Sequence, residues 1–383
     1  MSLVFSEEQR LLADTAVEFL AARSPVAAQR RLRDAGPAEG CDAGLWRDIV
    51  ALGWSAIPFA EEHGGLAFGC QGLGAVFEQI GATLAATPLL SSVVLGGGAI
   101  ALAGDAAQHA AWLPALIAGG RRVALAVDEQ PRHDPAGTAL VARRDGEAWV
   151  LDGDKVFVAD GIGADAFVVV ARSAGRPGET AGLSLFVVPA QAAGVGVSPM
   201  RLIDSRNHAR LRLDGVRLDA TALLGRAGDG WAVLDAVLDR GRVCLAAELL
   251  GASQTLFDTT VEYLKTRVQF DAPIGAFQAL QHRAAWCYSH LQLARSAVMA
   301  GLAALDDATL PAGERARLAS LAKWKAGETA HRISREAVQM HGGMGVTDEL
   351  EVGLFLKRIR VAQACLGDGD FLCQRYADTL RER

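Results

Sequence analysis

The chain has 383 residues, a formal net charge of -6 and a pI near 5.8, with 51% hydrophobic and 21% charged residues. This length predicts two or three domains, and we expect three. The composition excludes a disordered chain, and without a basic excess neither nucleic acid nor an anionic membrane is an expected partner.

Cysteine usage and the N-terminal sequence indicate the compartment. The six cysteines include no C-x-x-C pair, so neither a disulfide framework nor a zinc site is predicted, and a reducing cytoplasm fits. The N-terminal residues lack a basic stretch followed by an apolar run, and no segment holds about 18 uninterrupted apolar residues. We therefore expect a cytoplasmic protein without a membrane span.

The N-terminal part has helical periodicity. Ser6 precedes Glu7, Glu8 and Gln9, an order typical of a capped helix start, and apolar residues then recur at helical spacing. Helices are also predicted at residues 45–52, 71–86, 89–103 and 106–117, between breaks that contain glycine, proline or aspartate. Residues 1–120 are therefore predicted to form an all-α domain.

The period changes at Arg121. Short runs such as A-F-V-V-V-A and L-S-L-F-V-V-P alternate with Gly, Asp and Pro turns up to Gly225. At residues 209–216, A-R-L-R-L-D-G-V, apolar and polar residues alternate as in a half-buried antiparallel strand. Residues 121–225 are therefore predicted to form an antiparallel β sandwich or barrel.

Helical patterns return after residue 226. No proline occurs between Trp231 and Arg267, which predicts one unusually long helix. Three further long helices are predicted at 277–305, 312–340 and 348–366, and a final one near 371–380. The short links favour antiparallel neighbours, so residues 226–383 are predicted to form a four-helix bundle.

Two motifs combine groups that suit an anionic ligand. Residues 266–282, T-R-V-Q-F-D-A-P-I-G-A-F-Q-A-L-Q-H, place a fixed cation, aromatics and amides at a helix end, as a dinucleotide requires. A plain helix corner with exposed polar residues is the alternative. Residues 339–345, Q-M-H-G-G-M-G, add an amide beside glycines whose backbone can approach an anion closely. A glycine helix stop explains these glycines but not Gln339.

The sequence resembles the acyl-CoA dehydrogenase family of flavoenzymes over nearly its whole length. The most specific matches are R-V-Q-F at 267–270, P-I at 273–274, F-Q at 277–278 and the glycine motif at 339–345. Weaker collinear matches begin at Leu45, Glu61 and Phe77. The resemblance implies FAD as the cofactor and agrees with the helical, β and helical-bundle domains predicted above.

The resemblance also assigns the cofactor contacts. Arg267 would meet the FAD pyrophosphate from across a subunit boundary, and residues 277 and 278 would lie near the adenine half. The flavin ring would lie against the strand of Phe157. The predicted cofactor-binding residues are Arg267, Gln269, Phe270, Phe277, Gln278, Gln339, Gly342, Gly343, Phe157 and Ala159.

The flavin-facing part departs from the family pattern. Its glycine-rich loop corresponds to V-D-E-Q-P-R-H-D-P at residues 127–135, which contains no glycine. Phe157 can still pack on the flavin, but Ala159 lacks the hydroxyl that the family places near the reactive flavin nitrogen. Backbone N–H groups can partly replace that hydroxyl, and we expect looser FAD binding or a different redox potential.

The usual catalytic carboxylate is absent as well. Leu366 stands where the family has its glutamate base, and Gly241 stands at the known alternative position. The candidate catalytic residues are therefore Glu248 and Asp368. Glu248 shares the helix face of Gly241 but lies roughly 10 Å further along the axis, and a buried polar residue of the bundle is its alternative role. For Asp368 the alternative is the N-cap of the last helix.

The resemblance implies α,β-dehydrogenation of an acyl-CoA thioester to a trans-2-enoyl-CoA, with electrons passed to an electron-transferring flavoprotein. Asp239 and Arg242 match positions that contact the acyl-CoA. A homotetramer acting in fatty acid or steroid side-chain β-oxidation is expected. The alternative is a non-catalytic subunit that completes the FAD sites of a heterotetramer, and an acyl-CoA oxidase is a third option. His282 and His290 lack a third ligand at a suitable spacing, so no metal site is predicted.

Overall fold

The computed structural model describes residues 5–36 and 40–381, which form two compact units. The bundle unit comprises residues 5–34, 69–85 and 242–381, and the sheet unit comprises residues 35–36, 40–68 and 86–241. These units cut across the predicted boundaries at 120 and 225, because the N-terminal helices contribute to both. The division into three domains stays a prediction.

The N-terminal helices begin with a reciprocal cap. The Ser6 side chain accepts a hydrogen bond from the Gln9 backbone, and the Gln9 side chain accepts one from the Ser6 backbone. One helix was predicted over residues 89–103, but its first part is π-helical. The α-helices are α1 (Glu7–Arg23), α2 (Val26–Ala35), α3 (Ala43–Ala51), α4 (Gly69–Thr83), α5 (Gly98–Ala103) and α6 (Ala106–Ile117), and the short helical segments are η1 (Trp54–Ala56), η2 (Glu61–His63) and the π-helical η3 (Leu89–Gly97).

The π-helical segment lies against the first strand of the sheet unit. The Ser92 hydroxyl accepts a hydrogen bond from the Val123 backbone N–H at 3.0 Å. A methyl group added at Gly96 would meet the Val123 carbonyl. The backbone of the π-helical segment therefore packs directly on this strand. The buried Ser92 within this segment accepts the hydrogen bond that joins the two elements.

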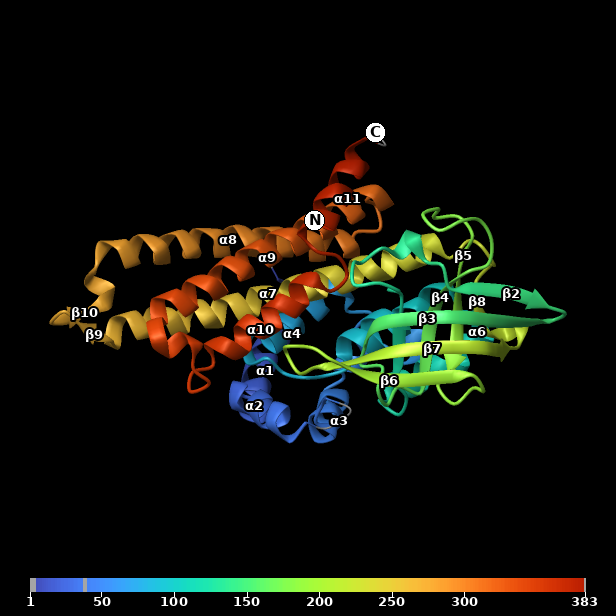
Figure 1. Cartoon of the computed structure of the whole chain (residues 1–383), viewed down its shortest axis with the longest axis horizontal. Coiled ribbons are helices and arrows are strands. Elements are labelled where there is room, and N and C mark those ends of the chain that lie inside the picture. The colour runs from blue at the N-terminus through green and yellow to red at the C-terminus, as the bar shows by residue number, and fades with distance from the viewer. Residues whose placement is uncertain (1–4, 37–39, 382–383) are drawn as a thin grey trace. The chain divides into compact units, whose positions relative to one another are not determined.

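Eight strands form one sheet within the described residues, in the order β6-β7-β3-β2-β4-β5-β8, with β1 paired to β4. Most pairs are antiparallel as predicted, whereas β1–β4 and β2–β4 are parallel. In Figure 1 the long strands β3, β7 and β6 lie side by side. The strands are β1 (Val123–Ala126), β2 (Val141–Asp145), β3 (Ala148–Ala159), β4 (Ala166–Arg172), β5 (Leu183–Pro189), β6 (Val195–Arg201), β7 (Asn207–Leu218) and β8 (Leu223–Leu224), with η4 (Pro135–Gly137) and η5 (Ala220–Ala222) between them.

The C-terminal helices confirm the predicted bundle. α8 and α9 pack along each other, and α10 and α11 pack on α9. The helices are α7 (Trp231–Thr266), α8 (Gln278–Asp306), α9 (Ala312–His341), α10 (Val352–Ala364) and α11 (Gly369–Arg381), with β9 (Val268–Gln269), β10 (Ala272–Pro273), η6 (Ile274–Ala276) and η7 (Gly342–Val346) in the links. The predicted fold class, N-terminal helices, a central β sheet and a C-terminal helical bundle, is therefore confirmed.

Two glycines bring α4 and α7 into backbone contact. A methyl group at Gly81 of α4 would meet the carbonyl of Glu248 on α7. Conversely, a methyl group at Gly251 of α7 would meet the carbonyl of Glu78 on α4. The two contacts are reciprocal, so the helices approach as closely as their main chains allow.

Candidate functional site

The first motif forms a strained hairpin between α7 and α8. Strands β9 and β10 pair across a two-residue turn, and Phe270 and Asp271 have φ values of 56° and 62°. Positive φ at both turn residues is the geometry of a type I′ turn, which normally takes Asn-Gly. Phe270 adopts it while 89% exposed, so burial of its ring within this chain does not explain the strain. Such strain is typical of a functional constraint.

Arg267 combines a fixed backbone with an open side chain. Its N–H donates to the Tyr263 carbonyl at 2.9 Å, and its carbonyl accepts from the Ile274 N–H at 2.8 Å. Its exposed guanidinium has no hydrogen-bond or ion-pair partner in the described part of the chain. A guanidinium held in this way is available to an anion such as phosphate.

Aromatic and amide groups surround this cation. The rings of Phe270 and Phe277 meet edge to face at 6.1 Å, and Phe277 is 38% exposed. Gln278, the first residue of α8, is exposed, and the side-chain amide of Gln269 donates to the Val268 carbonyl at 3.0 Å. The residues therefore form an exposed apolar surface bordered by amides.

The second motif ends α9 close to the first. The rings of Tyr263 and His341 stack at 4.2 Å, which joins the last turn of α7 to the last residue of α9. Gly342 has φ 59° and ψ -138°, a conformation that favours glycine, and its N–H donates to the Gln339 carbonyl. Space is open where a methyl group at Gly342 or Gly343 would stand. The structure thus brings both predicted motifs to one end of the bundle unit.

The predicted flavin-facing residues lie on β3 of the sheet unit. Phe157 and Ala159 are half-buried, whereas Val158 between them is 1% exposed. Phe157 has φ 55° and lies within a β-bulge, and its N–H donates to the Met200 sulfur at 3.4 Å. These two residues share the outer face of the strand, as a stacked ring would require.

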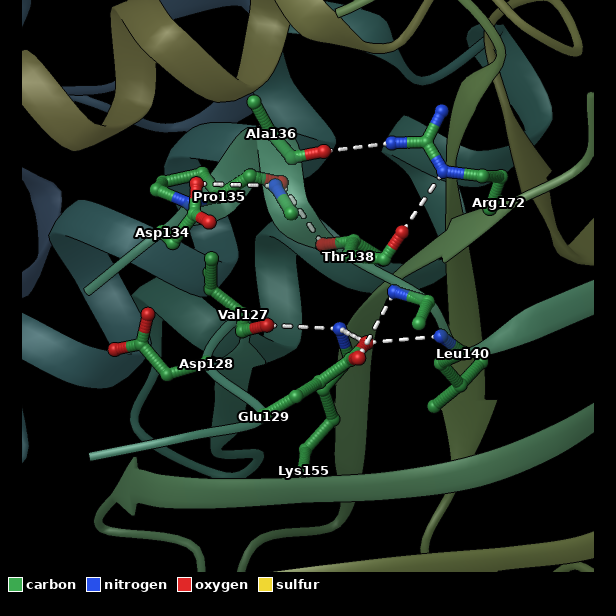
Figure 2. A network of polar contacts seen from close by, with 12 residues as sticks. Val127, Asp128, Glu129, Asp134, Pro135, Ala136, Thr138, Leu140, Lys155 and Arg172 are labelled. Carbon is green, nitrogen blue, oxygen red and sulfur yellow. Dashed lines mark hydrogen bonds and ion pairs between the residues drawn. The ribbon is translucent and has the colours of Figure 1, made fainter. Parts of the chain in front are cut away.

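The glycine-free loop is held by buried charges, which the sequence analysis missed. Lys155 of β3 is 0% exposed, and its ammonium donates to the Val127 carbonyl at 2.7 Å and to Glu129 at 2.8 Å (Figure 2). The Glu129 carboxylate also accepts from the N–H groups of Ala139 and Leu140 at 2.8 and 2.9 Å. Burial lowers the pKa of Lys155, and Glu129 opposes that shift. A lysine inside an apolar β run was the available signal in the sequence.

The position at which the resemblance places the catalytic base is a buried, left-handed turn. Leu366 is 8% exposed and has φ 57°, although it is not glycine. The Arg242 Nε donates to the Leu366 carbonyl at 3.0 Å, and the Lys323 ammonium donates to the Gln363 carbonyl at 3.0 Å. Burial lowers the pKa of Lys323 to about 8. Two buried cations therefore hold the backbone of a turn whose side chain has no acid–base chemistry.

Glu248 occupies a buried ion pair. Its two carboxylate oxygens accept from Arg358 at 2.6 and 3.0 Å, and the residue is 3% exposed. A carboxylate held in this bidentate way is stabilised in its charged form, which makes it a poor proton acceptor. This arrangement favours the structural alternative for Glu248 over a catalytic role.

Asp368 caps the last helix. Its side chain accepts a hydrogen bond from the Phe371 N–H at 2.9 Å, three residues further on, and the residue is exposed. This geometry is that of a helix N-cap. It favours the structural alternative for Asp368 as well.

The two predicted substrate residues lie on α7. Asp239 is 4% exposed in the sheet unit, and Arg242 is 1% exposed in the bundle unit. The Arg242 guanidinium lies over the ring of Phe371 at 5.5 Å. Arg242 is therefore fixed beside the turn of Leu366, while their role toward a substrate stays a prediction.

Metal and membrane chemistry find no support within the described ranges. There, no three His, Cys, Asp or Glu side chains group as metal ligands, and His290 instead accepts a hydrogen bond from Lys325 at 3.1 Å. No helix of residues 5–36 and 40–381 is long and apolar enough to cross a membrane.

Comparisons with known proteins agree with this geometry. Three family models match, described as the acyl-CoA dehydrogenase N-terminal domain over residues 6–120, middle domain over 126–216 and C-terminal domain over 228–380. The acyl-CoA dehydrogenase FadE12 of Mycobacterium tuberculosis is 34% identical over 323 residues, which is 83% of each chain. Human mitochondrial short-chain specific acyl-CoA dehydrogenase is 31% identical over 85% of this chain and 79% of its own.

Solved structures have the same fold. The ChsE4-ChsE5 complex of Mycobacterium tuberculosis contains a chain with a TM-score of 0.88 and 28% identity, and the match covers 100% of both chains. The chain described here therefore belongs to the acyl-CoA dehydrogenase family of FAD-dependent oxidoreductases.

Proposed function

We propose that this chain takes part in the α,β-dehydrogenation of an acyl-CoA thioester to a trans-2-enoyl-CoA, with electrons passed to an electron-transferring flavoprotein. The observation that carries the proposal is the exposed guanidinium of Arg267 in a strained aromatic hairpin, within a member of this family. Among the described residues this guanidinium has no hydrogen-bond or ion-pair partner. A tetramer in the cytoplasm, acting in fatty acid or steroid side-chain β-oxidation, is part of the same proposal.

The residues fit FAD on two observations. The guanidinium of Arg267 and the exposed ring of Phe270 offer a dinucleotide charge and stacking. The half-buried face of Phe157 and Ala159 offers a flat apolar surface to a flavin ring. Arg267 would therefore meet the pyrophosphate from across a subunit boundary, and Phe277 and Gln278 would lie near the adenine half. Phe157 would lie against the flavin ring.

The chemistry needs a hydride acceptor, a base and charge stabilisation. When bound, FAD accepts the hydride that leaves the β carbon of the thioester. Arg242 is buried and fixed by the Leu366 carbonyl, so its charge would stabilise the negative charge that develops as the α proton leaves. Asp239, the second proposed substrate residue, is also buried and would help to orient the acyl group.

The base supports a second candidate function. Leu366 offers no proton acceptor, Glu248 is paired with Arg358, and Asp368 caps α11. A partner subunit that supplies the base would explain all three arrangements. In this alternative the chain is a non-catalytic subunit that completes the FAD sites of a heterotetramer, and the two-protein ChsE4-ChsE5 complex is a structural precedent for a mixed assembly.

One experiment separates the two candidates. The chain is purified alone, its bound FAD is quantified, and reduction of an electron-transferring flavoprotein is followed with acyl-CoAs of increasing size. Turnover by the homomer supports the first candidate. A yellow but inactive homomer that gains turnover when it is coexpressed with a second family member supports the alternative. A colourless homomer that gains neither flavin nor activity from any partner contradicts both.

A further inference from the structure

The strand that carries Phe157 is irregular where it meets the predicted flavin face. Lys155 pairs with Leu211 of β7, and Val158 pairs with Ala209. Between these two pairs β3 contains one residue more than β7. This is a β-bulge, a device that redirects a side chain and is common beside active sites. Lys155 is completely buried, whereas Phe157, two residues later, is half-buried with φ 55°. The bulge therefore sends the lysine inward and turns the phenylalanine outward.

The bulge is held from both sides. On one side, the Phe157 N–H donates to the Met200 sulfur at 3.4 Å. On the other side, the carbonyl of Asp128 accepts from the Val156 N–H at 2.7 Å. The pairing of β2 with β3 does not extend beyond Asp152, so the segment that begins at residue 127 takes its place beside the bulge.

Lys155 fixes that segment to the strand. Its ammonium reaches the Val127 carbonyl and the Glu129 carboxylate, the residues on either side of Asp128 (Figure 2). Glu129 in turn accepts from the N–H groups of Ala139 and Leu140, just before β2 begins. A loop without glycines is thus ordered by an ion pair between the buried Lys155 and the half-buried Glu129, and the same pair supports the backbone next to Phe157. Removing either Lys155 or Glu129 would leave the charge of the other uncompensated, so the arrangement depends on both residues.

We infer that Lys155, acting through Glu129 and the Val127 carbonyl, is a positioning residue that holds the bulge of Phe157 in the geometry that receives the flavin ring. The inference rests on the proposed function, because Phe157 matters to the flavin only if FAD binds there. Lys155 itself touches no cofactor in this account. Its contribution is to fix the strained backbone of Phe157. A stacking ring binds its ligand less tightly when the ring is displaced or tilted even slightly from the productive geometry.

The test uses the full-length chain and three variants. Lys155→Met removes the ammonium but keeps the buried aliphatic stem, and Glu129→Gln removes the charge but keeps an acceptor oxygen. Val170→Ala, in β4, makes a cavity in the same unit at a residue that is 0% exposed, and it leaves the Lys155 and Glu129 side chains in place. For each protein, FAD affinity is measured by flavin fluorescence quenching, the visible flavin band is recorded, and the thermal midpoint is determined.

The inference predicts a graded loss that thermal stability does not explain. Lys155→Met should bind FAD about tenfold more weakly than the parent and shift the flavin band, with Glu129→Gln between the two. Val170→Ala should keep parental affinity and spectrum even at an equal loss of thermal midpoint. If Lys155→Met does not fold, the FAD affinity and flavin band of Glu129→Gln, the milder substitution, test the inference.

Other outcomes contradict the inference. Parental affinity and an unshifted band in both charge variants would overturn the positioning role while leaving the proposed function intact. An equal loss of affinity in Val170→Ala would reduce Lys155 to a general stabilising residue. A parent protein that binds no FAD would contradict the proposed function, and the positioning role with it.

Discussion

Two regions of the bundle unit differ in how their charged groups are used. The cofactor corner, residues 267–278 with 339–343, is exposed and leaves the charge of Arg267 without a partner in the described part of the chain. The base turn, residues 363–368, directs its exposed aspartate to a helix cap and binds its carbonyls with buried cations. Its central side chain is the apolar Leu366.

The two regions differ in the function that they would serve: the cofactor corner would bind FAD, and the base turn would carry the proton acceptor. Both regions contain left-handed non-glycine residues, so both backbones are constrained. In the cofactor corner the constrained backbone carries exposed groups that we propose bind FAD. In the base turn the constrained backbone carries an apolar leucine where the resemblance places the proton acceptor. The following predictions test that contrast, from the largest expected effect to the smallest.

The largest effect should come from Leu366→Glu. The turn already fixes the backbone at position 366, because the Leu366 carbonyl accepts a hydrogen bond from the buried Arg242. We expect acyl-CoA-dependent flavin reduction to rise by on the order of 10²- to 10⁴-fold over the parent, as general base catalysis supplies. Stopped-flow bleaching of the flavin measures this gain. Leu366→Gln is the matched control, because it has the same shape and no basicity; equal rates in the two variants would disprove the contrast.

Glu248→Leu should affect stability rather than catalysis. It leaves the half-buried Arg358 without the Glu248 carboxylate, and we expect a loss of about 3 kcal/mol in the free energy of unfolding, at the lower end of the range for buried pairs. Urea titration measures this loss. The double variant Glu248→Leu, Arg358→Met removes both charges and should recover most of the stability. Loss of turnover in a fully folded double variant, starting from an active parent, would instead restore Glu248 as a candidate base.

Arg267→Ala should weaken FAD binding. Loss of a charge-assisted contact to phosphate removes about 1.5–3 kcal/mol, or roughly 10- to 100-fold in affinity. Arg267→Lys should recover part of it, because the charge remains without the planar donors. Arg226→Ala is the control, since that side chain is 89% exposed in the sheet unit. Unchanged FAD affinity in Arg267→Ala would remove the main support for the cofactor corner.

The smallest effect concerns the cation that holds the base turn. The pKa of Lys323 is about 8 in the folded state against 10.5 for an ordinary lysine, so the unfolded state binds more protons between these values. The free energy of unfolding should therefore rise with pH in this window, by on the order of 1 kcal/mol from pH 7 to 9 relative to Lys323→Met. Parallel thermal melts measure the difference. Lys265→Met, at an exposed lysine, keeps Lys323 and should therefore keep the parental pH dependence.

The sequence predicted the fold because its signals are local. The proline-free stretch after Trp231 became α7, and the β-rich runs after Arg121 became the sheet. The parallel pairing of β1 with β4 was not predicted, because strand order depends on the path of distant segments. The π-helical turn at 89–97 was missed for a related reason, since its contact with Val123 lies outside any local window.

The site divides in the same way. The cofactor corner was proposed from the sequence because the residues of each motif are contiguous and match a family pattern, and its role toward FAD stays a prediction. The partner of Glu248 could not, because Arg358 lies 110 residues away and meets it only through helix packing. The bulge at Phe157 was not predicted, because K-V-F-V-A contains no glycine that would indicate a residue with positive φ. Lys155 was likewise counted as part of a strand, because its burial depends on that bulge.

The reciprocal glycines Gly81 and Gly251 limit how this site can diverge. A side chain at either position would meet the main chain of the opposite helix, so α7 cannot slide or roll against α4 without separating from it. Arg242 and Glu248 are therefore held at fixed positions relative to α4. For the proposed acyl-CoA site, substitutions along α7 should change the side chains that the helix presents without moving its backbone.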